Sequence, residues 1–212
     1  MNSTLNSKKG KKTFYQDCVF HVDENVYEPA EDTFLLAENL EVKKGEHVLD
    51  MGTGCGIIGV LAAKKGGRVV ATDINPYALK CAEKNAKLNG IHRKIEFRLG
   101  NLFEPIKPDE KFSLIAFNAP YLPSEPTEEQ TLIEKAWSGG QNGREVIDAF
   151  ISKVSSFLAE NGRVLLVQSS LSNIDETLQK FAQMGLEAEV IAKREVGFFE
   201  SIVLIRAVRK LS

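Results

Sequence analysis

From residue 46 onward, short apolar runs alternate with longer segments in which apolar residues recur at helical spacing. Apolar runs bounded by turn residues are typical of buried strands, whereas a period of three to four residues is typical of amphipathic helices. One helix start is well marked, because Asn75 can cap a helix that opens on Pro76, and Gly90 can end that helix. The pattern predicts strands at 46–51, 68–73, 94–99, 112–117, 162–168, 187–195 and 199–208, and helices at 31–41, 56–65, 76–89, 143–158 and 172–184.

Strands that alternate with amphipathic helices form right-handed crossover units around a mostly parallel sheet. The last two expected strands are separated only by Val196, Gly197 and Phe198, which is too short for a crossover helix. Those two strands should therefore pair antiparallel. We predict an α/β fold with a seven-stranded, mostly parallel sheet, an antiparallel C-terminal hairpin and helices on both faces.

The alternating pattern also divides the chain. Residues 1–13 are polar and include four lysines, which predicts a flexible basic tail. Residues 46–212 hold the whole strand and helix pattern and are expected to be one domain. The segment 14–45 between them is expected to be an N-terminal extension whose helix caps a ligand site.

Composition narrows the class of protein. The chain has 212 residues, 43% hydrophobic and 26% charged, which suffices for the core of one domain. A formal net charge of -2 gives no electrostatic reason to expect tight binding to nucleic acid. No apolar run approaches the roughly 20 residues of a membrane span, and no secretory signal precedes the domain, so we expect a cytoplasmic protein. The three cysteines and three histidines are scattered, so we expect no metal site.

A glycine-rich loop follows the expected strand 46–51. Gly52, Gly54 and Gly56 alternate there, and residues without side chains let the backbone approach a ligand closely at the N-terminus of the next helix. The segment also matches the dinucleotide pattern G-x-G-x-x-G, which would place a pyrophosphate in the loop. Asp50 opposes that interpretation, because a carboxylate just before the first glycine would repel a pyrophosphate. It would attract a methyl donor that carries an ammonium and a sulfonium group.

Two later strand ends extend the predicted donor site. Asp73 ends the second expected strand and is followed by Ile74, and its carboxylate can accept hydrogen bonds from both hydroxyls of a ribose. Asn101 and Leu102 follow the third expected strand, where an adenine would be held. The ribose contact is shared by S-adenosylmethionine and dinucleotide folds and does not separate them. An ordinary turn residue at Asp73 and an ordinary loop asparagine at Asn101 are the alternative interpretations.

The turn Asn118-Ala119-Pro120-Tyr121 follows the apolar strand 112–117. Asn118 offers a side-chain carbonyl acceptor, Pro120 stiffens the turn, and Tyr121 offers a flat aromatic face. Asparagine and proline end many strands, so the turn alone proves little. Because a donor-type glycine loop precedes it, we predict that the turn recognises a planar amide.

Several of these segments occur together, in an order that resembles a known family. They are Val26 to Leu36 with its Tyr-Glu-Pro-Ala-Glu-Asp-Thr core, the glycine loop, Asp73-Ile74-Asn75-Pro76, the Asn118 turn, and Ala136-Trp137-x-Gly139-Gly140-x-x-Gly143-Arg144-Glu145. From about residue 25 to 207, the chain resembles the HemK-type glutamine methyltransferases, and most of all their short archaeal and eukaryotic branch. The resemblance implies a Rossmann-like class I methyltransferase fold, S-adenosylmethionine as donor and S-adenosylhomocysteine as product. The implied reaction is N5-methylation of the glutamine in the Gly-Gly-Gln motif of a translation termination (release) factor.

The resemblance also implies roles for single residues. The side-chain oxygen of Asn118 and the backbone carbonyl of Ala119 would accept hydrogen bonds from the target NH₂, and Tyr121 would pack against the amide. Alanine at 119 replaces the usual proline, which keeps the carbonyl but makes the turn less stiff. The residues implied to line the donor site are Thr33, Asp50, Gly52, Asp73, Leu102 and Asn118.

Partners and rival functions follow from the same residues. The resemblance to the short branch implies a small zinc-binding activator subunit as partner, and with it an apolar docking surface. We expect the chain to lack the N-terminal helical domain of the longer bacterial relatives. An Asn-x-Pro-Tyr turn also serves exocyclic amines of nucleobases, so an N6-adenine-type or other nucleic-acid methyltransferase is the nearest alternative. A non-catalytic S-adenosylmethionine-binding partner protein is an alternative of another class. Gly139-Gly140-Gln141 repeats the substrate motif, but we interpret it as loop chemistry, and we expect Trp137 to pack as an anchor.

Overall fold

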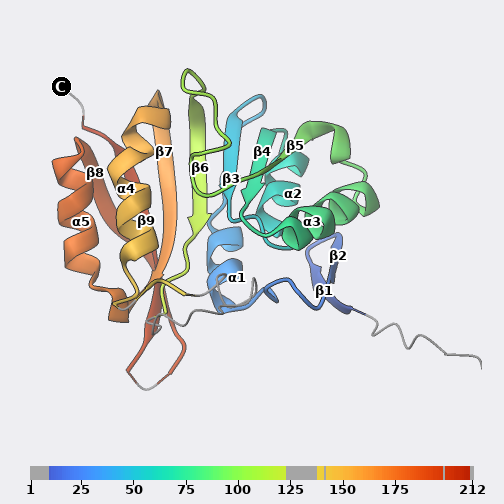
Figure 1. Ribbon diagram of the computed structural model, residues 1–212, viewed down its shortest axis with the longest axis horizontal. Helices are drawn as coiled ribbons and strands as arrows, with labels where there is room; N and C mark the ends of the chain where they lie inside the picture. The colour runs from blue at the N-terminus through green and yellow to red at the C-terminus, as the bar shows by residue number, and fades with distance from the viewer. Residues whose placement is uncertain (1–9, 123–137, 141, 198, 211–212) are drawn as a thin grey trace, which may run out of the picture.

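The computed structural model describes residues 10–122, 138–140, 142–197 and 199–210. A seven-stranded sheet in the order β5-β4-β3-β6-β7-β9-β8 forms its centre (Figure 1). The first five strands of that order are parallel, and β9 pairs antiparallel with both β7 and β8, which confirms the predicted architecture. The strands are β3 (His47–Met51), β4 (Arg68–Asp73), β5 (Ile95–Leu99), β6 (Phe112–Asn118), β7 (Leu158–Ser169), β8 (Leu186–Glu195) and β9 (Ser201–Arg209).

Helices cover both faces of the sheet (Figure 1). Along β6, Leu114 and Ala116 belong to the apolar cluster that the first three helices cover, whereas Ile115 and Phe117 belong to the cluster beneath the last two. A strand buried on both faces is apolar at successive positions, which explains the hydrophobic run from Leu114 to Phe117. The helices are α1 (Glu31–Glu38), α2 (Ile57–Lys64), α3 (Pro76–Leu88), α4 (Glu145–Phe157) and α5 (Ile174–Gln183), with short 3₁₀ turns η1 (His92–Lys94) and η3 (Ser170–Ser172).

The start of α3 confirms its predicted cap. The side chain of Asn75 accepts a hydrogen bond from the backbone N–H of Tyr77, and Pro76 occupies the first helical position, where its missing N–H costs nothing. Strand β7 differs from its prediction, since it begins at Leu158, directly after α4, instead of at 162. Leu158 pairs with Phe112 across a register shift, so the strand starts with an irregular segment that the apolar pattern does not mark.

A hairpin that the pattern did not predict precedes α1. Its strands are β1 (Lys11–Tyr15) and β2 (Cys18–Val22), and they pair antiparallel. The free edge of β2 is held by two asparagines of α3: Asn85 bonds the backbone N–H and C=O of His21, and Asn89 bonds those of Val19. Strand β1 begins at Lys11, so it overlaps the end of segment 1–13, which we expected to be a flexible tail.

Within the described residues, no helix is both long enough and apolar enough to cross a membrane.

Candidate functional site

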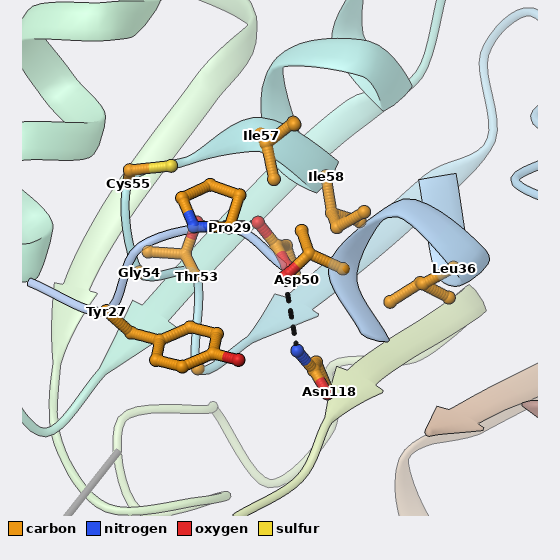
Figure 2. Close-up of a pocket in the computed structure, with 12 residues that line it drawn as sticks. Tyr27, Pro29, Leu36, Asp50, Thr53, Gly54, Cys55, Ile57, Ile58 and Asn118 are labelled. Atoms are coloured by element: carbon orange, nitrogen blue, oxygen red, sulfur yellow. Dashed lines mark hydrogen bonds between the residues drawn. The ribbon is translucent and has the colours of Figure 1, made fainter. Parts of the chain in front are cut away.

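The site lies where the sheet order reverses. Strand β3 stands between β4 on one side and β6 on the other, and all three run parallel. In such sheets a ligand crevice opens at the carboxyl ends of the strands that flank the reversal. A pocket of about 370 Å³, partly open to solvent, lies there (Figure 2). It is lined by Tyr27, Pro29, Thr33, Leu36, Asp50, Gly52, Thr53, Gly54, Cys55, Ile57, Ile58 and Asn118.

The pocket brings together five of the predicted site residues, which come from three distant parts of the chain. Thr33 lies on α1, Asp50 on β3, Gly52 and Gly54 in the loop that follows, and Asn118 at the end of β6. The remaining predicted residues lie outside this lining. They are Gly56, Asp73, Ile74, Asn101, Leu102, Ala119, Pro120 and Tyr121.

The glycine loop has a backbone that side chains would disfavour. Gly52, Gly54 and Gly56 have φ angles of +64°, +55° and +88°, in the left-handed region. A Cβ added at Gly54 would meet no protein atom within 4 Å, so neighbouring protein atoms do not account for that glycine. A Cβ at Gly56 would lie 2.8 Å from the Cβ of Ala82, so Gly56 serves the close packing of α3 against the loop.

The buried carboxylate of Asp50 stabilises the glycine loop. It is 3% exposed, and its Oδ2 accepts hydrogen bonds from the Thr53 hydroxyl at 2.6 Å and from the Gly59 backbone N–H at 2.8 Å. Gly59 must lack a side chain, since a Cβ there would lie 2.9 Å from that same oxygen. Burial raises the pKa of Asp50 from its ordinary 3.8 to about 7, although the two hydrogen bonds oppose the shift. A bound cation beside the carboxylate would lower this pKa again.

Asp73 links the glycine loop to the end of β4. Its two oxygens accept the backbone N–H of Gly54 at 3.0 Å and that of Asn75 at 2.8 Å. Burial raises the pKa of Asp73, and these backbone bonds oppose the shift. Each carboxylate oxygen can accept about two hydrogen bonds, so both retain capacity for a ligand hydroxyl.

The predicted adenine segment follows β5. Asn101 is exposed and its backbone N–H bonds the carboxylate of Glu104. Leu102 is half-buried and has a φ of +47°, an unusual conformation for a branched side chain. Such strain persists only where the surroundings hold it, and it is frequent at ligand sites. Ile74 is exposed at the start of the turn into α3.

Asn118 presents an unused acceptor beside the pocket. Its Nδ2 donates to the Thr33 hydroxyl at 3.4 Å, drawn as the dashed line in Figure 2, whereas its Oδ1 is buried and accepts no hydrogen bond from the described residues. The Thr33 hydroxyl in turn donates to Asp32 Oδ1 at 3.2 Å. Because a carboxylate only accepts, the chain of donors runs from Asn118 to Asp32, and this polarity leaves the amide oxygen free.

Tyr121 is fixed at both ends. Its hydroxyl donates to Asp32 Oδ2 at 3.2 Å, and its backbone carbonyl accepts from the Ser172 hydroxyl at 2.9 Å. Burial, followed by the charge of Asp32, raises the pKa of Tyr121. Gly143 lies directly against the same carbonyl, where a Cβ would approach to 2.3 Å, which explains the glycine at that motif position.

Arg144 braces this turn from behind. It is 3% exposed and donates to the carbonyls of Ser172 and Asn173, to the Thr177 hydroxyl at 3.0 Å and to Asp148 at 2.7 Å. Since Ser172 also bonds Tyr121, the arginine fixes the segment that supports the turn. Trp137 and Gln141, singled out in the same motif, lie outside the described residues.

Sequence reasoning missed Asp32 and Tyr27 as site residues. The Tyr27 hydroxyl donates to Asp32 Oδ2 at 3.0 Å, and the Tyr27 ring lines the pocket. Both residues stand in the segment that carried the family resemblance, so their motif was the available signal. No local pattern, however, indicates that they meet a turn almost ninety positions later.

A switch-point pocket, a left-handed glycine loop, two carboxylates at strand ends and a free amide oxygen together define a class I methyltransferase. The family comparison gives the same result. The chain belongs to the methyltransferase small domain family, whose pattern matches residues 29–195. Enzymes of this class take their methyl group from S-adenosylmethionine.

Three similar proteins narrow the comparison. A Methanocaldococcus jannaschii protein, provisionally named a protein N5-glutamine methyltransferase, is 42% identical over 84% of this chain and 90% of its own. The human methyltransferase HEMK2 is 36% identical over 82% of this chain and 85% of its own. A solved structure of the E. cuniculi Mtq2–Trm112 complex, described as responsible for methylation of the eRF1 translation termination factor, matches with 26% identity and a TM-score of 0.67. That match covers 88% of this chain and 99% of the solved one.

Proposed function

We propose that this protein transfers a methyl group from S-adenosylmethionine to the side-chain amide nitrogen of a glutamine, within the Gly-Gly-Gln motif of a translation termination factor. The observation that carries the proposal is the oxygen of Asn118, a buried acceptor with no hydrogen bond from the described residues. An unsatisfied buried acceptor is costly, so its presence beside a ligand pocket favours a donor supplied by the substrate. The names of the similar proteins point to glutamine as that substrate.

The residues present fit the methyl donor. Gly54 leaves open space where a side chain would stand, and Asp73 retains acceptor capacity for ribose hydroxyls. Asp50 places a carboxylate beside the pocket for a cationic group, and Asn101 and Leu102 would flank the adenine. When bound, S-adenosylmethionine supplies an electrophilic methyl group on a sulfonium.

The acceptor turn would activate a poor nucleophile. An amide nitrogen is weakly nucleophilic because its lone pair is delocalised into the carbonyl. Two acceptors on the NH₂ hydrogens, from Asn118 Oδ1 and the Ala119 carbonyl, would aim the lone pair at the methyl group and stabilise the positive charge that develops on nitrogen. The Asn118 oxygen is buried, so neighbouring atoms must move aside for the target. The N-methylated product sheds its proton readily, so the reaction needs no dedicated general base.

The partner proposal is a small zinc-binding activator subunit. It is supported by the similar E. cuniculi protein, which was solved as a complex with Trm112. The described residues of this chain contain no group of three or more side chains that could hold a metal ion.

A labelling experiment tests the proposal. Labelled S-adenosylmethionine is supplied with a termination factor, its Gln-to-Ala variant in the Gly-Gly-Gln motif, tRNA and DNA, each with and without the activator subunit. We expect label only in the unaltered factor, on that glutamine by mass spectrometry. Label in nucleic acid but not in protein would assign the enzyme to the amine-directed alternative, and label in nothing would leave a donor-binding partner protein.

A further inference from the structure

Asp32 is the most heavily bonded carboxylate around the pocket, yet the proposed reaction gives it no role. It is the second residue of α1 and is 4% exposed. Its Oδ1 accepts the backbone N–H of Thr33 at 2.6 Å and the Thr33 hydroxyl at 3.2 Å. Its Oδ2 accepts the hydroxyls of Tyr27 at 3.0 Å and Tyr121 at 3.2 Å. One side chain therefore joins the wall of the donor pocket to the acceptor turn.

A helix-start acid does not need this arrangement. Acidic residues in the first turn of a helix favour its dipole from the surface, as exposed Glu31 does at the neighbouring position. Burying a carboxylate is costly unless its oxygens are bonded, and here the bonds come from three side chains and one backbone group. Asp32 therefore orders the three residues that donate to it, Tyr27, Thr33 and Tyr121.

The Asp32 carboxylate fixes the donor and the acceptor of each hydrogen bond that it receives. An ionised carboxylate has no proton to give, so the Thr33 hydroxyl must donate to it. The remaining lone pairs of that hydroxyl then face the amide of Asn118, which must present its NH₂ to Thr33. The oxygen of Asn118 is thereby left without a donor from the described residues.

We propose that Asp32 is a positioning residue that sets, through Thr33, which end of the Asn118 amide meets the target. The inference rests on the proposed function and deepens it. With the amide reversed, the Asn118 NH₂ would face the NH₂ of the target glutamine, and two donors cannot form a hydrogen bond. The same carboxylate holds the Tyr121 hydroxyl, so both residues of the turn depend on one group.

The substitution Asp32→Ala tests the relay by removing the acceptor of the Thr33 hydroxyl. Without the carboxylate, that hydroxyl can donate to the Asn118 oxygen and stabilise the reversed amide. We expect single-turnover methyl transfer to fall about 100-fold or more, the scale of losing one aligned transition-state hydrogen bond, with donor affinity by calorimetry changed less than threefold. The matched control is Glu46→Ala, which removes a half-buried carboxylate paired with Arg163 just before β3, at the end away from the pocket, and should leave the transfer rate unchanged.

Two further readouts separate orientation from general loss of structure. The side-chain amide NMR signals of Asn118, identified by their loss in Asn118→Ala, should shift in Asp32→Ala but not in Glu46→Ala. In a double-mutant cycle, Thr33→Val combined with Asp32→Ala should be no slower than the slower single variant, because both break one relay. The NMR signals of Asn118 are measured without substrate, so they test the inference even if the wild-type protein methylates no termination factor.

Each result counts for or against the proposal. Unchanged Asn118 signals in Asp32→Ala, or transfer at the wild-type rate in that variant, would overturn it. Fully additive losses in the cycle would also overturn it, because the two side chains would then act separately. A wild-type protein that fails to methylate the termination factor while the Asn118 signals shift as expected would contradict the proposed substrate and leave the positioning role intact.

Discussion

The donor side and the acceptor side of this site are built differently. The proposed donor side is mostly backbone: a loop with three left-handed glycines, held by Asp50 and Asp73. Their hydrogen-bond partners lie in the β3–α2 loop, in the first turn of α2 and in the β4–α3 connection. The acceptor side is mostly side chains, and the Asn118 turn is held by residues of α1 and of the segment around Ser172.

The difference assigns a task to each side. A backbone cradle suits a donor that is the same in every turnover, because its shape needs no adjustable side chain. A side-chain clamp suits an acceptor whose hydrogens must be oriented, because the polarity of an amide is set by its neighbours. Damage to the donor side should therefore change binding, whereas damage to the acceptor side should change rate.

The largest expected effect is that of Asn118→Ala on transfer. Removing the acceptor leaves the amide hydrogens of the target unaligned, so single-turnover transfer should fall by about 10³-fold, the upper scale for losing one transition-state hydrogen bond. The control is Asn39→Ala, since the amide of Asn39 only bonds the Leu35 carbonyl at the end of α1. Equal transfer rates for the two variants would show that Asn118 does not orient the target amide.

Arg144→Met should cost the next most, in stability. Losing the buried arginine leaves two carbonyls without their donor, which should lower the free energy of unfolding by ~3–5 kcal/mol in a denaturant titration. The control Arg194→Met, at a half-buried arginine, breaks ion pairs to Glu31 and Glu38 and should cost less than ~1 kcal/mol. If the two substitutions lower the free energy of unfolding equally, the hydrogen bonds of Arg144 near Tyr121 do not stabilise the fold.

Asp50→Asn should change how the stability of the fold depends on pH. The folded pKa of about 7 lies above the ordinary 3.8, so this group stabilises the fold fully below about pH 4, and that contribution is lost as pH rises through 7. Asparagine carries no charge at any pH, so the variant keeps this stability at pH 8. There it should unfold at a higher temperature than wild type, with a free energy of unfolding larger by up to ~4 kcal/mol. At pH 4 the two proteins should differ little. A thermal difference that does not change with pH would contradict the raised pKa.

The smallest effect is expected from Ala119→Pro. The backbone N–H of Ala119 donates to the Val167 carbonyl at a long 3.4 Å, a bond that proline cannot make, while proline would fix φ. The two changes oppose one another, so the transfer rate should stay within about threefold of wild type. A much faster variant would show that the turn is limited by its flexibility.

The sequence predicted the sheet and the donor loop because their signals are local. The apolar run of β6 and the Asn75-Pro76 helix start each depend on neighbouring residues, and both were confirmed. The hairpin of β1 and β2 was missed because β1 is largely exposed, and because asparagines of α3 hold β2 through bonds between positions 64 to 70 apart. Asp32 was missed for the same reason, since its contact with Tyr121 spans 89 positions.

The division between binding and rate is tested most directly by calorimetry of S-adenosylmethionine with Asn118→Ala and Asp73→Ala side by side. We predict that Asp73→Ala weakens donor binding by about 10- to 100-fold, because it would remove the charge-assisted bonds to the ribose that we propose for this carboxylate. Asn118→Ala should bind the donor within about threefold of wild type despite its loss of transfer. Equal losses of donor affinity in the two variants would contradict the account.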